Sequence, residues 1–261
     1  MKRYLAFLFG VSSYGIFFAT FLYLIGFLAN AFVPKGIDTG APGDALVALA
    51  VNVGLIALFG LQHSIMARPR FKAVWTKIVP RPIERSVYVL FSSLALIALY
   101  AWWQPMPAVV WQAQTPAVAA LCTAVFALGF GLVLVSTFVI DHFDLFGLRQ
   151  VFLHLRNRPY EALPFQVRFL YRVVRHPLYV GWFLAFWATP VMTVGHLLFA
   201  AGMSAYIVIA VRHEERDLVR YHGKDYVEYQ RRVPKFVPRL GAVHAAIAPA
   251  SKRAATSTGS H

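Results

Sequence analysis

The chain alternates between long apolar runs and short stretches that carry nearly all of its charges. Runs of about 18 or more residues without charge are typical of membrane-spanning helices. Four such runs are followed by a longer one, and together they cover Tyr4–Val33, Leu46–Met66, Ser86–Trp103, Thr115–Ile140 and Pro177–Val211. The pattern therefore predicts an all-α polytopic membrane protein.

The last of these runs is too long for a single span. As one helix it would measure roughly 52 Å, whereas the hydrocarbon core of a bilayer is about 30 Å thick. Pro190 and Gly195 lie near its middle and favour a break there. We expect a helical hairpin with arms near Leu178–Thr189 and His196–Val211, which makes about six transmembrane helices in total.

The distribution of Lys and Arg indicates the orientation. With six spans, the connections 34–45, 104–114 and 190–195 lie on one side of the membrane. Of the 25 Lys and Arg residues, only Lys35 lies in these connections, and the other 24 lie on the side of the termini. The positive-inside rule then predicts that both termini are cytoplasmic. Basic loops on the cytoplasmic side, together with their contact to anionic head groups of the bilayer, explain the net charge of +14 without a nucleic acid.

The character of the chain changes after Ile140, where polar, aromatic and Arg-rich sequence begins. We therefore divide the chain into a four-helix transmembrane body at 1–140, a C-terminal module at 141–240 and a tail at 241–261. Within the module, residues 212–221 and 224–232 read as helices with Gly223 as the turn between them. The tail is rich in Ala, Ser and Thr, which predicts disorder.

Several familiar catalytic patterns are missing from the sequence. It has no HxxHH histidine box, no H-E-x-x-H and no G-x-S-x-G, which argues against di-iron oxygenases, zinc proteases and α/β-hydrolases. No metal site is expected. Gly129 and Gly131 lie inside an apolar run, where small residues serve helix packing rather than a nucleotide site. The single cysteine, Cys122, cannot form an intrachain disulfide.

A polar constellation brackets the predicted hairpin. Arg175 and His176 precede Pro177, which suits the first turn of a helix whose free N–H groups attract an anion. Glu214 and Glu215 lie at the other end of the same hairpin and should come close to them. Such a cluster could bind a zwitterionic ligand. A plain interfacial ion pair between Arg175 and Glu215 explains the same residues equally well.

The segment from Arg175 to Pro238 contains R-H-P-x-Y-x-G and, later, a Glu-Glu pair. In this it resembles the C-terminal module of isoprenylcysteine carboxyl methyltransferases and phospholipid methyltransferases, which bind S-adenosylmethionine. The resemblance implies that the 141–240 module binds this cofactor. It implies that His176 and Tyr179 contact the cofactor and that Gly181 allows its close approach. Glu214 and Glu215 would bind the polar end of the cofactor. Arg175 and Tyr226 would shape the pocket.

Three further segments extend the resemblance over nearly the whole chain. Residues 61–69 (LQHSIMARP), 85–90 (RSVYVL) and 136–147 (STFVIDHFDLFG) look like those of the bacterial methanethiol S-methyltransferases and the related NnrU-like proteins. This implies a bacterial inner-membrane enzyme that methylates a small thiol, converting methanethiol to dimethyl sulfide. Alternatives are an isoprenylcysteine- or phospholipid-type methyltransferase, an NADPH-dependent membrane reductase, or a noncatalytic NnrU-like protein.

A thiol is a poor nucleophile until it loses its proton, so a base is expected in the pocket. His63 lies near the cytoplasmic end of the second span, and Asp141, His142 and Asp144 lie at that end of the fourth. We predict that these four residues form the catalytic acceptor side. The simpler alternative is that they are interfacial or helix-capping residues.

Overall fold

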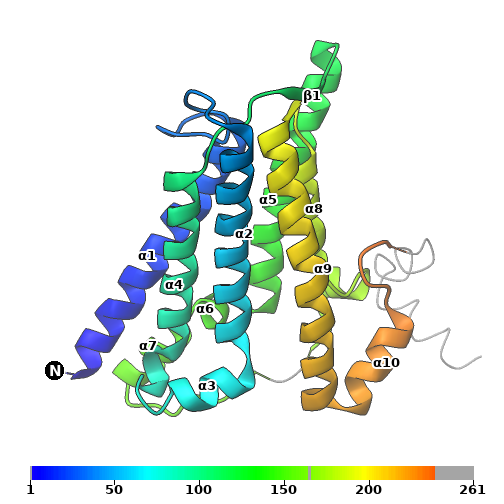
Figure 1. Ribbon diagram of the computed structural model, residues 1–261. Coiled ribbons are helices and arrows are strands. Elements are labelled where there is room, and N and C mark those ends of the chain that lie inside the picture. Colours follow the sequence, from blue (N-terminus) through cyan, green and yellow to red (C-terminus); the bar gives the residue numbers. More distant parts are fainter. Residues whose placement is uncertain (1, 164–165, 239–261) are drawn as a thin grey trace, which may run out of the picture.

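The computed structural model describes residues 2–163 and 166–238, and these form a bundle of long helices (Figure 1). Within these residues, five helices are long and apolar enough to cross a membrane. They are α1 (Lys2–Ala29), α2 (Ala45–Ala67), α4 (Arg81–Trp102), α5 (Pro116–Ile140) and α9 (Val194–His222). The prediction of an all-α polytopic membrane protein is therefore confirmed. The tail at 241–261 lies outside the described residues, so its disorder stays a prediction.

Shorter elements connect and cover the long helices. The helical ones are α3 (Pro69–Trp75), α6 (His142–Leu145), α7 (Leu148–Leu155), the 3₁₀ turn η1 (Phe169–Arg172), α8 (Pro177–Trp187) and α10 (Lys224–Arg232). Two short strands, β1 (Val109–Gln112) and β2 (Val191–Thr193), pair antiparallel, with Val109 opposite Thr193 and Gln112 opposite Val191.

The predicted hairpin is present, but its two arms are unequal. The first arm, α8, has 11 residues and measures about 16 Å, which is too short to cross a bilayer by itself. The second arm, α9, has 29 residues and measures about 43 Å, so the segment 212–221 continues the membrane helix instead of forming a separate one. Gly223, with φ of 59°, ends α9 at the predicted turn.

The three connections expected on one side do meet at one end of the bundle. The hydroxyl of Thr193 donates to Asp38 Oδ1 at 2.7 Å, which joins the hairpin turn to the first connection. Asn52 at the start of α2 exchanges two hydrogen bonds with the backbone of Gln104, of 2.8 and 2.9 Å. The start of α1 lies at the opposite end, together with α3, α7 and α10 (Figure 1).

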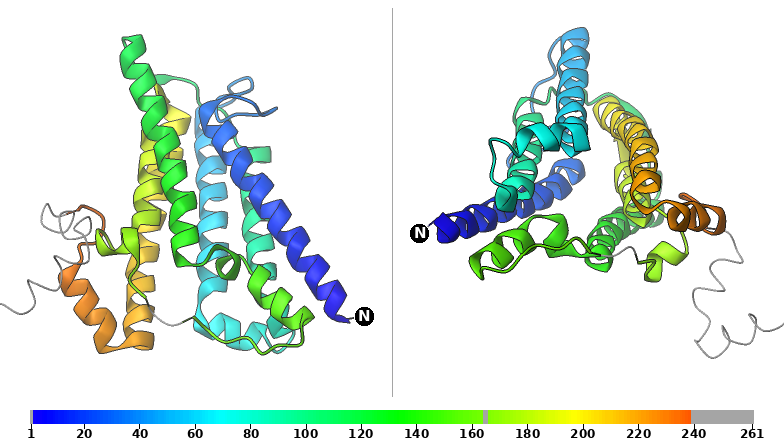
Figure 2. Two further views of the ribbon diagram at one scale, coloured as in Figure 1. Left: turned by 180° about the vertical axis from the view of Figure 1, so that it is seen from behind. Right: turned by 90° about the horizontal axis from the view of Figure 1, so that it is seen from below.

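Close packing of α5 against α8 depends on two glycines. A Cβ placed on Gly129 would lie 2.5 Å from the backbone nitrogen of Ala185, and one placed on Gly181 would lie 2.7 Å from the carbonyl oxygen of Gly129. The two helix backbones are therefore in direct contact, and α5 runs alongside the hairpin (Figure 2). Gly131 has open space around it, so only the first glycine of the G-x-G pair makes this contact.

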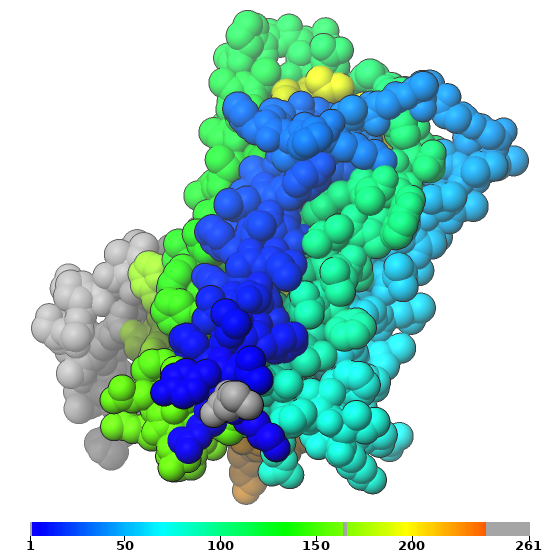
Figure 3. Space-filling model, turned by 90° about the vertical axis from the view of Figure 1, so that its left-hand side faces the viewer, coloured from blue at the N-terminus to red at the C-terminus, as the bar shows by residue number. Residues whose placement is uncertain are grey.

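Apolar side chains cover the outside of the bundle as well as its inside. The main buried core lies between α1, α2, α4, α5, α8 and α9 and includes Phe27, Trp103, Phe186 and Phe199. Large apolar side chains are also exposed along α1, which Figure 3 shows between α4 and α5. An apolar outer surface on long helices is what contact with lipid requires, and it supports an integral membrane protein.

Candidate functional site

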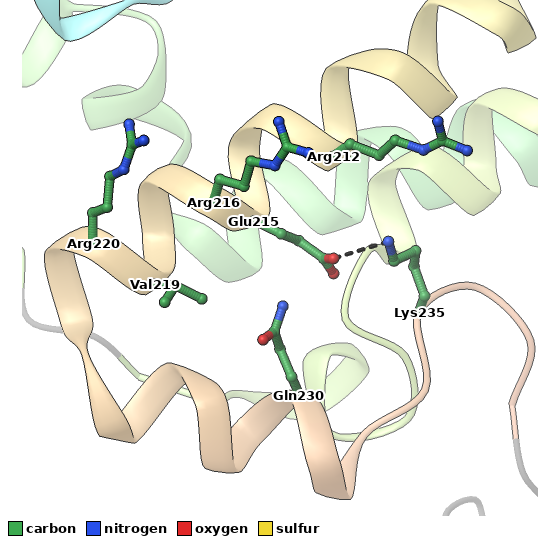
Figure 4. Close-up of a pocket in the computed structure, with 7 residues that line it drawn as sticks. All are labelled: Arg212, Glu215, Arg216, Val219, Arg220, Gln230 and Lys235. Atoms are coloured by element: carbon green, nitrogen blue, oxygen red, sulfur yellow. Dashed lines mark ion pairs between the residues drawn. The ribbon is translucent and has the colours of Figure 1, made fainter.

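Glu215 is the centre of an ion-pair network at the start of α8. Its Oε1 accepts hydrogen bonds from Arg175 Nε at 2.9 Å and from His176 Nε2 at 3.0 Å. Its Oε2 lies 2.8 Å from Lys235 Nζ, an ion pair drawn in Figure 4. Both oxygens of this buried carboxylate are thus already paired. The ion pair of Arg175 with Glu215 that the sequence left as an alternative is present.

This network holds three chain segments together. The Arg175 guanidinium also donates to the carbonyl oxygen of Gln230 at 2.9 Å. The backbone N–H groups of Arg175 and His176 donate to the carbonyls of Pro234 and Lys235, at 2.8 and 3.2 Å. Because these bonds connect the start of α8 to the segment after α10, and Glu215 connects both to α9, the module closes on itself at this point.

Glu214 has different partners from its neighbour. Its Oε2 accepts a hydrogen bond from the hydroxyl of Tyr179 at 2.8 Å. The carboxylate also lies close enough to the hydroxyls of Tyr88 and Tyr206 to act on them electrostatically. We call Tyr88, Tyr179, Tyr206 and Glu214 the tyrosine cluster. Its members come from α4, α8 and α9.

His63 extends the tyrosine cluster onto α2. Its Nε2 lies 2.8 Å from the hydroxyl of Tyr88, and its Nδ1 lies 3.0 Å from the hydroxyl of Ser92. Its ring stacks on Phe59 with centroids 5.2 Å apart and meets the Tyr206 ring edge-on at 6.2 Å. Of the four residues predicted for the acceptor side, His63 is the one that contacts the tyrosine cluster, through Tyr88 and Tyr206.

The other three residues form a separate group against α1 and α7. His142 is buried at 2% exposure, with Nε2 2.9 Å from the hydroxyl of Tyr14 and Nδ1 2.8 Å from that of Thr137. Burial lowers the pKa of His142 below its ordinary value. Asp141 caps α6 by accepting from the backbone N–H of Asp144, and Asp144 pairs with Arg149 at 2.9 Å.

Two of the predicted cofactor residues, Gly181 and Tyr226, pack against other parts of the chain, and this packing accounts for their presence at these positions. Gly181 faces α5, so the close approach that it permits is the approach of that helix. Tyr226 is buried at 2% exposure beside Tyr229, with ring centroids 5.6 Å apart, in a small apolar cluster that includes Val233. Burial, and after it the charge of Glu215, raises the pKa of Tyr226.

Two cavities lie near these groups. A groove of about 490 Å³ lies between α9, α10 and the following segment, and its lining comprises Arg212, Glu215, Arg216, Val219, Arg220, Gln230 and Lys235 (Figure 4). Within the described part of the chain, Arg212 and Arg216 form no ion pair. A second cavity of about 730 Å³ lies between α3, α4, α6 and α7 and includes Asp141 and Asp144 in its lining.

The sequence did not single out Tyr88, Ser92, Tyr206 or Lys235. Tyr88 lies in the segment 85–90 already noted for its resemblance, and its hydroxyl in an apolar span was a signal that could have been used. Tyr206 carried the same signal, as a polar group within the long run 177–211. Nothing in the sequence pointed to Lys235. Its ion pair with Glu215 depends on the segment after α10 packing against α9, which the sequence does not show.

Comparisons with known proteins agree with this architecture. Residues 117–225 match the phospholipid methyltransferase family. The chain is 48% identical to a methanethiol S-methyltransferase of Crocosphaera subtropica over 92% of this chain and 94% of that protein. It is 49% identical to a methanethiol S-methyltransferase of Mycobacterium tuberculosis, over 91% and 98% of the two chains. A human protein, Nurim, is 32% identical over 66% of this chain and 69% of its own length. No solved structure matches the chain.

Proposed function

This chain belongs to the family of the methanethiol S-methyltransferases, and we propose that it transfers the methyl group of S-adenosylmethionine to methanethiol, giving dimethyl sulfide. The observation that carries the proposal is that two neighbouring carboxylates near the start of α8 have different partners. Glu215 is held in the ion-pair network, whereas Glu214 accepts a hydrogen bond from Tyr179 within the tyrosine cluster.

The cofactor has a carboxylate at one end and a cationic sulfonium near its middle, and the groups around Glu214 are complementary to the sulfonium. Glu214 and the ring of Tyr179 suit the sulfonium through charge attraction and cation–π contact. The ring of His176 lies 5.6 Å from that of Tyr179.

In this arrangement the cofactor site is stabilised, without direct contact to the cofactor, by Arg175, His176, Glu215 and Tyr226. The acceptor thiol enters on the side of His63, where aromatic rings suit a small apolar molecule. Alignment of the thiol with the methyl–sulfonium bond, away from water, supplies much of the rate enhancement. The contacts favour His63 for the acceptor side over Asp141, His142 and Asp144, whose roles there stay predictions.

We also propose that the end of the bundle with α3, α7 and α10 faces the cytoplasm of a bacterial inner membrane. The charge distribution supports this, because Lys35 alone among the Lys and Arg residues lies in the connections at the other end. Reporter fusions after Pro42 and Pro107 should then report the periplasm, and fusions after Lys77 and Arg158 the cytoplasm. A cytoplasmic signal at Pro107 would contradict the proposed orientation.

The activity is tested with purified protein in lipid nanodiscs, methyl-labelled S-adenosylmethionine and a panel of thiols. We expect labelled, volatile dimethyl sulfide from methanethiol, together with saturable binding of the cofactor. Transfer to a prenylated cysteine or a phospholipid in preference to methanethiol would move the substrate to a different class. NADPH oxidation without methyl transfer would overturn the proposed activity.

A further inference from the structure

Two histidines in the described structure have the same arrangement of hydrogen bonds. Each ring has its Nδ1 against a Ser or Thr hydroxyl and its Nε2 against a tyrosine hydroxyl. For His63 the partners are Ser92 and Tyr88. For His142 they are Thr137 and Tyr14. The two sites differ in the groups that surround the tyrosine hydroxyl.

The partners determine which nitrogen of His63 carries the proton. The Ser92 hydroxyl donates its one hydrogen to the backbone carbonyl of Tyr88 at 2.9 Å. It can therefore only accept from His63, so in the neutral ring Nδ1 bears the proton and Nε2 is the free acceptor. The Tyr88 hydroxyl then donates to Nε2. His63 has no nitrogen left for a ligand, but the oxygen of Tyr88 can still accept a hydrogen bond.

The same logic gives the same tautomer at His142, because Thr137 donates to the carbonyl of Leu134. The surroundings of the two tyrosines nevertheless differ. Tyr14 and His142 lie among Phe138, Phe143 and Phe146. Tyr88 instead shares His63 with Tyr206, whose ring meets the His63 ring edge-on with centroids 6.2 Å apart, and the charge of Glu214 acts on Tyr88.

We propose that Tyr88 is the catalytic residue that takes the proton of the thiol, with His63 as the final acceptor behind it. This rests on the proposed function. The S–H proton moves to the oxygen of Tyr88 while the proton of Tyr88 moves to His63 Nε2. The sulfur electron pair forms a bond to the methyl carbon, and the methyl–sulfonium bond breaks. The products are dimethyl sulfide, S-adenosylhomocysteine and a His63 imidazolium, so atoms and charge balance.

The charges around this transfer act in two directions. The reaction converts a sulfonium into a neutral thioether as the imidazolium forms, so that positive charge moves and none is created. The Arg85 guanidinium lies over the Tyr88 ring, 5.0 Å from its centroid; it favours negative charge on the phenol oxygen during the transfer and opposes the positive charge that His63 gains. Arg85 is itself held in place by donating to the carbonyl of Leu145 at 2.7 Å.

The test compares Tyr88→Phe with Tyr14→Phe, which removes the equivalent hydroxyl from the other histidine. Both variants are assayed in nanodiscs for S-adenosylmethionine affinity and for turnover of methanethiol between pH 6 and 9. We expect Tyr88→Phe to bind the cofactor normally and to lose roughly 100-fold in methanethiol turnover, with partial recovery at high pH. Tyr14→Phe should keep its turnover.

A second acceptor distinguishes proton removal from positioning. Trifluoroethanethiol is larger than methanethiol but more acidic, because its fluorines withdraw electrons, so it depends less on a base. We expect Tyr88→Phe to lose much less turnover with this thiol. An equal loss with both thiols, or full methanethiol turnover at neutral pH, would overturn the proposal.

Should Tyr88→Phe fail to fold, Ser92→Ala tests the same idea, since it leaves Tyr88 intact. Without the Ser92 acceptor the proton on His63 is free to move to Nε2, and turnover of methanethiol should fall about 10-fold with a changed pH profile. An unchanged profile would contradict the relay. If the wild-type protein methylates no thiol, the proposed function itself is wrong.

Discussion

Glu214 and Glu215 are neighbours on α9, yet their carboxylates have entirely different partners. Glu215 meets Arg175, His176 and Lys235, whereas Glu214 accepts from Tyr179. Successive side chains on a helix point about 100° apart, so one pair of residues can serve two sides of α9. We infer that Glu215 builds the site and that Glu214 contacts what binds in it.

Replacing Glu215 by Gln should mainly destabilise the protein. The change leaves Arg175 and Lys235 without their carboxylate, and breaking a buried ion pair costs roughly 3–5 kcal/mol. We expect a lower thermal unfolding temperature in detergent and weaker cofactor binding as a consequence. Glu228→Gln is the matched control, because Glu228 pairs with Arg232 on the exposed side of α10. Equal stability of the two variants would contradict the role given to Glu215.

Replacing Glu214 by Gln should have the opposite profile. The fold should persist, because Gln can still accept the hydrogen bond of Tyr179, but the attraction to a sulfonium is lost. We expect the affinity for S-adenosylmethionine to fall by about 10-fold or more, in keeping with roughly 1.5–3 kcal/mol for a contact to a charged group. The affinity for S-adenosylhomocysteine, whose sulfur is neutral, should hardly change. Calorimetry with both ligands measures this difference, and a parallel loss for both would place the sulfonium elsewhere.

The direct contact of α5 with α8 predicts intolerance at Gly181. Even Ala there would place a Cβ 2.7 Å from the carbonyl oxygen of Gly129 and 2.8 Å from the backbone nitrogen of Val133, so one helix must shift. We expect Gly181→Ala to lower the yield of folded protein and to displace Tyr179 from Glu214. Gly131→Ala is the control, since its Cβ would meet nothing within 4 Å. Size-exclusion profiles and cofactor binding compare the two.

The features that depend on local sequence were predictable, and those that depend on how the helices rotate against each other were not. The apolar runs, the break near Pro190 and the turn at Gly223 follow from composition and backbone preference. The short first arm also followed, since an arm near Leu178–Thr189 was predicted and α8 spans Pro177–Trp187. The length of α9 did not follow, because the polar composition of 212–221 does not show that this segment continues the preceding apolar helix. The separation of His63 from His142 also required the packing, since both lie near the same end of their helices in the sequence.

The buried ring of His142 predicts how stability depends on pH. Burial lowers its pKa in the folded protein below the value of about 6.5 expected in the unfolded chain, so the unfolded state binds the proton more readily. The stability that the neutral ring supports is therefore fully present above about pH 6.5 and is lost as the pH falls through the folded pKa. In His142→Gln the amide carbonyl can still accept from Tyr14 but does not titrate in this range. The variant should be less stable than the wild type at pH 8, and the difference between their unfolding temperatures should shrink toward pH 5. A difference that stays constant with pH would show that His142 does not titrate as its burial requires.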